Sequence, residues 1–348
     1  MTRTVTPFAV LVCVLSTSAP AQDQMPGPAP ELKKLEPLLG NWSGTGKMTE
    51  PGGVVTQWQA HGTWRWCLDG HFLQEDLAVA FTGIATPMVI RGYYGWDREH
   101  GRYVHLTATS AGQIRMHELK LMPDGGLLQI MVQDEAALPY AERSVIAVAG
   151  DTMTHTIDLL LPEGASMAFI DSRFTRGGEA FGGAFTAPPF MDGKPHEAVA
   201  RLCKSAGAYE TKGEMILAPG QGTMKISGTD TFLAVFGGTV LHGHTDGAAE
   251  GMPGKYEGEV FWGWDSARKR ILGIYVSNMG EVMTMDAWWS SDGRLISTMA
   301  GVYQGQPTVQ RMLMEFDVAG AAKSAVGHTI AGTAAPFESF RCTYTKKK

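Results

Sequence analysis

The chain has few cysteines, few charged residues and no long apolar segment, and each shortage excludes a class of protein. Four cysteines in 348 residues are too few for a disulfide framework, and they form no Cys-x-x-Cys pair, so a structural zinc site is not expected either. Charged residues make up 18% of the chain, the formal net charge is −6, and no long run has one sign. Nucleic acid and anionic membranes are therefore not expected as partners.

The N-terminus carries the pattern of an export signal. Arg3 precedes an apolar run over residues 5–15, which is about half the roughly 20 residues that a membrane-spanning helix needs. Small residues follow and end in Ala-Pro-Ala at residues 19–21, the pattern at which signal peptidase cleaves. We expect residues 1–21 to be removed, leaving a periplasmic or extracellular protein that does not insert into a membrane.

Three cysteines remain after this cleavage, namely Cys67, Cys203 and Cys342. An odd number allows at most one disulfide within one chain. Cys203 and Cys342 lie at the two ends of the second half, so they meet if that half closes on itself. Their spacing in the sequence does not place the two sulfur atoms within bonding distance, and the pairing stays open.

The chain contains an internal repeat. Gly-Trp-Asp at residues 95–97 recurs 168 positions later at residues 263–265, and the same offset aligns GHFL with GTVL. At an offset of 167, LGNWSGTGKM from Leu39 aligns with AGAYETKGEM from Ala206. The repeated unit is about 140 residues long, whereas solenoid repeats span about 20–50 residues, so each copy is expected to be a whole domain.

Each copy has the composition and periodicity of short strands. The 43 glycines and 18 prolines of the chain favour many tight turns. Met283, Met285, Ala287 and Trp289 share one face of a period-two pattern, as a half-buried antiparallel strand requires. One sheet of about eight to ten strands that closes on itself removes all exposed edges. A closed barrel is therefore the predicted architecture, with a two-sheet sandwich as the alternative.

The repeat and the glycine-rich stretch between its copies set the expected domain boundaries. They are a signal peptide (1–21), a linker with an entry helix (22–38), a first β-barrel (39–177), a Gly/Pro-rich linker (178–194) and a second β-barrel (195–348). Helix is expected in the entry segments alone, over residues 30–39 and 196–205.

Several segments resemble the DUF1579 family, in the same order along the chain. PAPELKKLEPLLGNWSGTGKM and KPHEAVARLCKSAGAYETKGEM are similar to its opening of a proline, a short helix and a Leu-Gly-Thr-Trp-like strand. GHFLQED, GYYGWDREHGRYV and RCTYTK are similar to its later segments. The second copy departs from the pattern with Tyr209 for tryptophan and Thr211 for glycine. The resemblance implies an all-β fold of two tandem calycin-like, lipocalin-type antiparallel β-barrels, each preceded by a short helix. The family has no established activity, so no chemistry is implied.

A related resemblance bears on cofactors. Nitrobindins, which are calycin-like haem proteins, open with a comparable Gly-x-Trp-x-Gly strand and ligate haem through a histidine on the last strand. The corresponding strands here, FIDSRFTR and ESFRCTYT, contain no histidine. Haem is therefore not expected, and no other cofactor and no metal is predicted.

The repeated Gly-Trp-Asp turns are interpreted as structural. Asp97 and Asp265 are expected to accept hydrogen bonds from backbone N–H groups of their own hairpins, as turn aspartates usually do. Trp96 and Trp264, together with Trp42 of the first Gly-aromatic strand, are expected to close the ends of the barrels.

The histidines divide according to the face of the strand on which they lie. His155 and His328 each share the apolar face of their strand, so both are expected to point inward. There they are either hydrogen-bonded core histidines or polar anchors for a ligand. His105 alternates with Val104 and Leu106 and is expected to face solvent.

The two copies differ in one strand. At the 168 offset, Arg115 and His117 of the first copy correspond to Met283 and Met285 of the second. If this face points inward, an acidic ligand or an internal carboxylate would stabilise Arg115; the alternative is a rim position from which Arg115 reaches water. The methionines either line an adaptable apolar site or fill a core.

These observations favour an exported binding module for a small apolar or amphipathic ligand, including an acidic one. The candidate ligand-binding residues are Arg115, His117, His155, His328, Met283 and Met285. One alternative is a lipocalin-fold enzyme, such as an isomerase or cyclase, although no Gly-x-Ser-x-Gly, phosphate loop or metal triad in the sequence supports it. The other is a structural or interaction protein with filled barrels. The sequence makes no prediction of oligomeric state.

Overall fold

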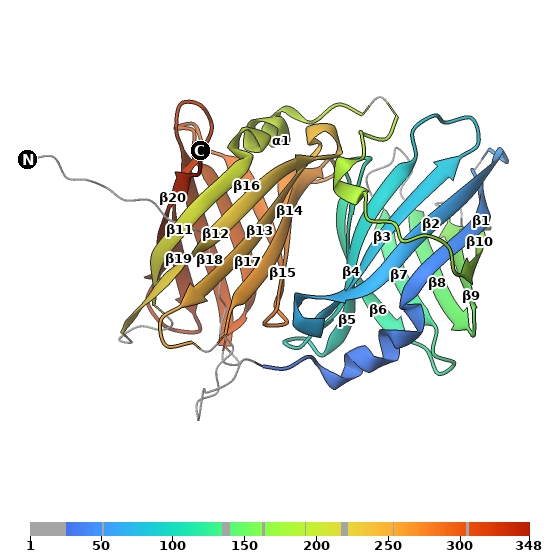
Figure 1. Ribbon diagram of the computed structural model, residues 1–348, viewed down its shortest axis with the longest axis horizontal. Helices are drawn as coiled ribbons and strands as arrows, with labels where there is room; N and C mark the ends of the chain where they lie inside the picture. The colour runs from blue at the N-terminus through green and yellow to red at the C-terminus, as the bar shows by residue number, and fades with distance from the viewer. Residues whose placement is uncertain are drawn as a thin grey trace, which may run out of the picture.

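The chain folds into two closed antiparallel β-barrels in a computed structural model (Figure 1). The structure describes residues 26–50, 52–133, 140–161, 164–191, 193–216, 222–252, 254–303 and 306–348. The predicted signal peptide lies outside these ranges. Within them, none of the helices has the length and apolar character needed to cross a membrane.

The first barrel is an up-and-down sheet in which each strand pairs with the next, and β1 closes the ring by pairing with β10. Its strands are β1 (Gly40–Thr49), β2 (Val55–Cys67), β3 (Phe72–Phe81), β4 (Met88–Asp97), β5 (Arg102–Thr109), β6 (Ile114–Leu121), β7 (Leu127–Gln133), β8 (Tyr140–Ala149), β9 (Thr152–Leu160) and β10 (Ser166–Arg176).

The second barrel repeats this topology, and β11 closes it by pairing with β20. Its strands are β11 (Gly207–Ile216), β12 (Thr223–Val235), β13 (Val240–Ala249), β14 (Tyr256–Asp265), β15 (Arg270–Ser277), β16 (Val282–Trp289), β17 (Leu295–Tyr303), β18 (Gln306–Phe316), β19 (Ala322–Ala331) and β20 (Phe337–Lys346). The predicted all-β tandem barrels are therefore confirmed.

The helices are short, and the expected entry helices are α-helical only in part. The 3₁₀ helix η1 (Pro30–Leu38) precedes the first barrel, and α1 (Glu197–Leu202) with η4 (Cys203–Ser205) precedes the second. Further single turns are η2 (Leu68–Gly70), η3 (Ala184–Thr186) and η5 (Phe236–Gly238). Pro37 inside η1 lacks the N–H that an α-helix would use there, which favours the irregular form.

Each entry helix closes one end of its barrel. The apolar side of η1 packs on the first core, where fully buried Trp42 donates its indole N–H to the carbonyl of Leu38 at 2.8 Å. In the second barrel, buried Tyr209 donates its hydroxyl to the carbonyl of Ser205 at 2.6 Å. Tyrosine and tryptophan thus occupy the same position, because each has an apolar body and one polar group for the helix end.

The Gly-Trp-Asp turns have the same construction in both copies. Asp97 accepts a hydrogen bond from the backbone N–H three residues later at 3.2 Å, and Asp265 does so at 2.9 Å. Trp96 packs against the core of the first barrel and Trp264 against that of the second. The repeated motif therefore orders a hairpin turn at one end of each barrel.

The two barrels pack together through the outer faces of equivalent strands. One apolar cluster joins β3 to β6 of the first barrel with β13 to β15 of the second. A Cβ at Gly112 would lie 3.2 Å from Thr239, and a Cβ at Gly280 would lie 3.0 Å from His71. Because Gly280 and Thr239 lie 168 positions after Gly112 and His71, these contacts are reciprocal, as in a two-fold interface. In Figure 1, η1 lies below the first barrel and α1 lies above the second. The ends that the entry helices close therefore point in opposite directions in the two barrels.

The segment between the barrels lies against both of them. Phe181 donates its backbone N–H to the hydroxyl of Thr63 at 2.8 Å. Fully buried Ala184 belongs to the apolar cluster between the barrels, and Phe185 packs against that cluster. Cys67, Cys203 and Cys342 are all free thiols, so the disulfide that the sequence left open is not formed.

Candidate binding cavity in the first barrel

The interior of the first barrel contains a cavity of about 580 Å³. Most of its wall is apolar, and the side chains include Met48, Phe81, Met88, Ile90, Ile146 and Met153. Volumes of this size fall within the range of pockets that hold small molecules.

A pair of ionisable side chains lies in this wall. Glu75, which is 5% exposed, approaches the His105 ring with 3.1 Å between Oε2 and Nε2. The His105 ring stacks on Tyr94, with 3.9 Å between ring centroids. Burial, and then the charge of Glu75, raise the pKa of Tyr94 well above its usual value. The hydroxyl of Tyr94 therefore stays protonated, and the cluster presents one carboxylate, one imidazole and one phenol.

Gly92 makes room for the Glu75–His105 pair. It faces Glu75 across the β3–β4 ladder and Thr107 across the β4–β5 ladder. A Cβ at this position would lie 2.8 Å from both Glu75 Oε2 and His105 Nε2, which is closer than a carbon atom can approach. Glycine is therefore required at residue 92 if the two side chains are to meet.

Two more histidines line the same cavity. His155 shares a 2.8 Å hydrogen bond with the hydroxyl of Ser144. Burial lowers the pKa of His155 to about 4. Burial, and then the positive charges of His105 and Arg115, lower the pKa of His117 to about 3. Both rings are therefore neutral at pH 7 and offer one donor and one acceptor each.

The cavity also contains a buried polar atom that lacks a partner. The hydroxyl of Thr109, a residue 7% exposed, makes no hydrogen bond to any described residue. A buried hydroxyl without a hydrogen bond costs about 1–3 kcal/mol. A water molecule or a bound ligand in the cavity would remove that cost.

The second barrel carries none of this cluster at the equivalent positions. The 168 offset holds in the strand pairing, because Glu75 faces Gly92 just as Gly243 faces Val260. Glu75 is thus replaced by Gly243, and His105 by Gly273. At Gly273 a Cβ would lie only 2.5 Å from the Trp262 ring, which fills the space that the imidazole occupies in the first barrel.

The family can be assigned from the whole chain. The model of the family DUF1579, described as a protein of unknown function, matches residues 27–176 and 193–322, once for each barrel. This chain belongs to DUF1579. No curated protein matches this DUF1579 protein.

Solved structures similar to this DUF1579 protein are distant from it. Rv2717c from M. tuberculosis is 16% identical, covers 43% of this chain and 99% of its own, and has a TM-score of 0.35. The S-type phycobiliprotein lyase CPES from Guillardia theta is 10% identical, with coverages of 42% and 92% and a TM-score of 0.32. A protein of the DUF3598 family from Nostoc punctiforme is 10% identical, with coverages of 92% and 100% and a TM-score of 0.28. The function of this DUF1579 protein is argued from its own cavity.

The structure places the predicted site residues in three different environments. Arg115, His117 and His155 all line the first cavity. Met285 is buried in the core of the second barrel, and Met283 packs against that core at the barrel's mouth. The histidine cluster and the methionines therefore belong to separate sites of the DUF1579 protein.

His328 does not point inward, contrary to the prediction from its strand face. It is exposed, and Ile330 on the same face is 45% exposed. The pairing of β19 is irregular, with register shifts between Glu315 and Phe316 and between Gly327 and His328. Because a bulge moves the following residues to the opposite face, the Thr-His-Thr-Ile and Gly-His-Thr-Ile segments of the two copies differ in orientation.

Sequence reasoning missed Glu75 and placed His105 on the wrong face. His105 lines the cavity, whereas Val104 and Leu106 are buried against the second barrel. The apolar face of β5 is thus its outer face. Comparison of the copies at residue 105, where the second barrel has Gly273, was the available signal.

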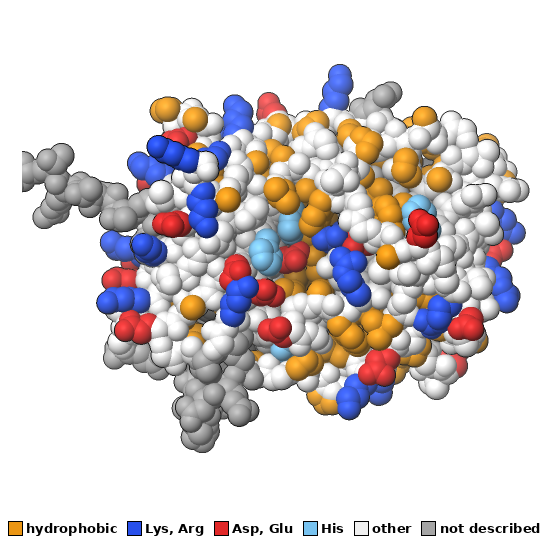
Figure 2. All heavy atoms as spheres, viewed as in Figure 1, with side chains coloured by type: hydrophobic (Ala, Val, Ile, Leu, Met, Phe, Trp, Pro, Cys, Tyr) orange, Lys and Arg blue, Asp and Glu red, His pale blue; other side chains and the backbone are white. Residues whose placement is uncertain are grey.

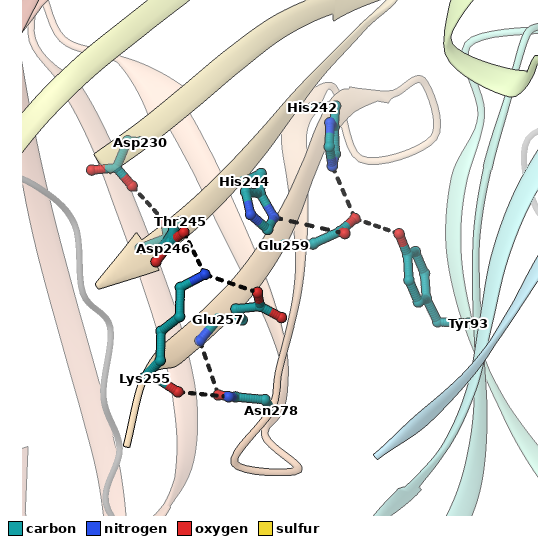
Figure 3. A network of polar contacts seen from close by, with 10 residues as sticks. All are labelled: Tyr93, Asp230, His242, His244, Thr245, Asp246, Lys255, Glu257, Glu259 and Asn278. Atoms are coloured by element: carbon teal, nitrogen blue, oxygen red, sulfur yellow. Dashed lines mark hydrogen bonds and ion pairs between the residues drawn. The ribbon is translucent and has the colours of Figure 1, made fainter. Parts of the chain in front are cut away.

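Polar side chains also meet between the barrels (Figure 2). Figure 3 shows the Tyr93 hydroxyl of the first barrel donating to Glu259 of the second, whose carboxylate also contacts His242 at 3.0 Å and His244 at 3.8 Å. Burial tends to raise the pKa of Glu259, but the hydrogen bonds from His242 and Tyr93 outweigh it and hold the pKa at about 2. This network joins the two barrels and lies outside the cavity.

One group in the described ranges has the composition of a metal site. Asp97, Glu99 and His100 each offer a ligand atom, all within 4.8 Å of one another. Asp97 Oδ2 already contacts the His100 ring at 2.7 Å and Arg102 Nε at 3.1 Å. These contacts assign the carboxylate to the turn and leave no argument for a metal.

The lowered pKa values of two cavity histidines predict how the stability of the protein depends on pH. In the unfolded chain His117 and His155 titrate near 6.5, whereas in the fold they titrate at about 3 and about 4. Between these values the unfolded state binds more protons, so the free energy of unfolding should fall as pH decreases from about 6.5 to about 4. Asp230, whose pKa burial raises to about 6, acts in the opposite sense. Urea titrations at several pH values measure this for the protein and for the double variant His117→Gln/His155→Gln. The free energy of unfolding should depend less on pH in the variant, and an equal dependence would contradict the lowered pKa values of these two histidines.

Proposed function

We propose that the first barrel binds a small, mostly apolar molecule whose polar end lies at Glu75, His105 and His155. The observation that carries this proposal is the difference between the copies, because the first interior is hollow and polar around Glu75 and His105, whereas the equivalent place in the second is filled by the Trp262 ring. Buried polar groups reduce stability unless they have partners. A ligand is a reason to retain them in one copy while the second copy serves as scaffold.

The charges of the wall favour a neutral polar end over an acidic one. Arg115 lines the cavity together with two carboxylates, Glu75 and Glu142, both buried. Since His117 and His155 are neutral at pH 7, the buried wall has no excess of positive charge. A carboxylate on a ligand would lose its hydration there without a net attraction in return, so an alcohol, ketone or amide on an apolar body fits better than a fatty acid.

The test uses a neutral fluorescent probe, N-phenyl-1-naphthylamine, displaced by long-chain alcohols and by the matching fatty acids. We expect the alcohols to compete better. Glu75→Gln keeps the shape of the side chain but removes its charge, and should weaken alcohol binding about tenfold, as loss of a charge-assisted hydrogen bond does. Gly92→Ala should have a similar effect because its Cβ forces Glu75 and His105 apart.

The control is Gly182→Ala, because a Cβ there would meet no atom within 4 Å. Probe binding that Glu75→Gln and Gly92→Ala leave unchanged would refute a site at this pair. Stronger competition by the fatty acids, lost in Arg115→Met, would instead establish the acidic ligand that the sequence also allowed.

The linker forms part of the wall of this cavity. Phe190 and Met191 line it, and the backbone N–H of Phe190 donates to the carbonyl of Ser110 at 2.8 Å. The Phe190 ring packs on Phe81, with 5.8 Å between centroids. A ligand that enters at this end has to displace the Phe190 side chain.

Phe190→Ala should therefore accelerate both association and dissociation of the probe, with a smaller change in affinity. Gly237→Ala offers a second route from the other barrel, because its Cβ would lie 2.5 Å from Pro189 and would push the linker aside. Stopped-flow fluorescence measures both rates. Unchanged rates in both variants would show that the ligand enters elsewhere.

A second candidate is acid–base catalysis on the bound molecule. The specific observation is the contact between Glu75 and His105 at 3.1 Å inside an enclosed cavity, since a carboxylate that orients an imidazole is a common general base. Native mass spectrometry of protein from its own host decides between the two. A ligand retained unaltered supports binding, and a ligand converted by the purified protein but not by His105→Asn supports catalysis.

Export also remains our proposal, because residues 1–21 lie outside the described ranges. N-terminal sequencing of the protein from its host should find Gln22 first. A retained Met1 would contradict it.

A further inference from the structure

A second cavity lies at the mouth of the second barrel and is completed by the first. It measures about 270 Å³. Its floor comes from the second barrel, and one side comes from the β4–β5 turn of the first barrel, over residues 97–102. A Cβ at Gly301 of β17 would lie 3.7 Å from Glu99 Oε1 of that turn and 3.7 Å from the hydroxyl of Thr308. The cavity is therefore enclosed only when the two barrels are packed together.

The apolar lining of this cavity consists of thioethers and aromatic rings. Five of the 19 methionines in the chain line it, namely Met116, Met215, Met279, Met283 and Met299. Phe337 and Phe340 lie beside them. A thioether sulfur makes favourable contacts with the edge of an aromatic ring, and its flexible chain adjusts to the position of the ring. The lining therefore favours an aromatic body over an aliphatic body of the same size.

One buried acceptor in the wall has no donor. Gln310, which is 8% exposed, shares the inner face of β18 with the core residue Met312. It donates its amide N–H groups to the hydroxyls of Thr329 and Ser339 at 3.1 Å each. Its Oε1 has no hydrogen-bond partner in the part of the chain that the structure describes. A buried carbonyl oxygen without a donor favours a ligand that brings one.

The charged groups around the cavity are already bound within the protein. Glu281 accepts hydrogen bonds from the hydroxyls of Tyr256 at 3.0 Å and Ser277 at 2.6 Å. Arg102 contacts two carboxylates, at 3.1 Å and 2.9 Å, and the guanidinium of Arg98 donates to a backbone carbonyl. Both signs of charge thus line the cavity with partners of their own. A charged ligand would lose its hydration there without a net attraction in return, which favours a neutral ligand.

The two copies differ in charge at the position of Gln310. Glu142 faces Met131 across the β7–β8 ladder, just as Gln310 faces Met299 across the β17–β18 ladder, 168 positions later. Both side chains are buried, and each lines the cavity of its own barrel. The second barrel thus has a neutral amide where the first has a carboxylate, which again favours a neutral ligand in the second.

We propose that this cavity is a second binding site, separate from the first-barrel cavity, and that it takes a small neutral aromatic molecule with one hydrogen-bond donor. The N–H or O–H of the ligand bonds to Oε1 of Gln310, and its ring lies on the methionines. An apolar cavity of about 150 Å³ already holds benzene, so a cavity of about 270 Å³ has room for a ring system of the size of indole.

The first experiment is calorimetric titration of the full chain with two matched pairs of compounds. Indole and benzofuran have the same shape, but only indole has an N–H, so indole should bind about tenfold more tightly. Phenol and cyclohexanol each have one hydroxyl, and phenol should bind severalfold more tightly because its ring is aromatic. Gln310→Met keeps the length of the side chain and removes the acceptor, so it should abolish the preference for indole over benzofuran.

The second experiment locates the ligand. Gly301→Leu places a side chain inside the cavity and should abolish indole binding, with an unchanged circular-dichroism spectrum as the check of its fold. In protein labelled with [methyl-¹³C]methionine, the ring current of bound indole should shift the methyl resonances of the lining, and Met283→Leu should remove one of the shifted signals. Glu75→Gln, which alters the first cavity, should leave indole binding unchanged.

Each result decides a different point. Equal affinity for indole and benzofuran would overturn the hydrogen bond to Gln310, and cyclohexanol that binds as tightly as phenol would overturn the aromatic body. Indole binding that survives Gly301→Leu, or that is lost in Glu75→Gln, would overturn the site in the second barrel. Failure of alcohol binding in the first cavity would contradict the function proposed above and leave this site standing.

Discussion

Replacing Asp76 with alanine should lower the free energy of unfolding by about 3–5 kcal/mol, because it leaves a buried guanidinium without the carboxylate to which it is hydrogen-bonded. Asp76 is completely buried and receives Arg91 at 2.6 Å, Gln74 at 2.8 Å and Arg65 at 3.0 Å. Arg91 is itself only 7% exposed and stacks over the Phe185 ring of the linker at 3.8 Å. It therefore cannot turn to water once its partner is removed. For a chain of this size the thermal midpoint should fall by roughly 10 °C.

Two further variants separate the lost charge pair from simple loss of packing. Asp76→Asn keeps the size of the side chain and should cost less than Asp76→Ala. The double variant Asp76→Ala/Arg91→Met removes both charges and should recover a large part of the stability, since paired removal of a buried ion pair is often close to neutral. Calorimetry on the three variants measures this. A double variant less stable than Asp76→Ala would refute the buried-charge explanation.

The fold was predictable because its signals are local or repeated. Period-two alternation, Asp-Gly turns and the 168-position repeat identify short strands and two copies without any knowledge of what each strand contacts. The prediction of the second barrel held although Tyr209 stands where the first copy has Trp42. Each of these side chains fills one end of its barrel and donates one hydrogen bond to the entry helix.

The faces of the strands were harder to predict, because an apolar face can be covered from either side. Val104 and Leu106 are apolar because the second barrel buries the outer face of β5, and His105 consequently points inward. Nothing in β5 alone distinguishes this arrangement from the reverse. β4 shows the same cover from outside the barrel, since both of its faces are buried over most of its length.

The hollow interior of the first barrel depends on several small differences between the copies. One of them was visible in the sequence, where the first copy has Arg115 and His117 and the second has Met283 and Met285. In a second difference, Gly243 and Gly273 of the second copy replace Glu75 and His105. In a third, Val260 replaces Gly92. The volume itself follows from how Trp262 packs over Gly273, which is a tertiary contact that periodicity does not contain.

Cutting the chain in the linker should give two β-rich halves that do not remain monomeric by themselves. In a half consisting of residues 195–348, the apolar outer face that includes Phe236, Phe261 and Ile274 would lose its cover. An exposed patch of this kind drives association. We therefore expect the isolated second half to self-associate, with a circular-dichroism spectrum that is still typical of strands.

Mixing the two halves should instead produce a 1:1 complex. The interface is reciprocal, so a homodimer of the second half would place a second Glu259 where the intact chain has Arg91, 168 positions earlier. Like charges at one buried position disfavour the homodimer, whereas Tyr93 and Arg91 of the first half favour Glu259. Native mass spectrometry should show the heterodimer replacing the homodimer, and Glu259→Gln in the second half should weaken this preference, because it removes both the like-charge contact of the homodimer and the attraction to Arg91 in the heterodimer. A monomeric second half that ignores the first would mean that the linker, and not complementary surfaces, holds the barrels together.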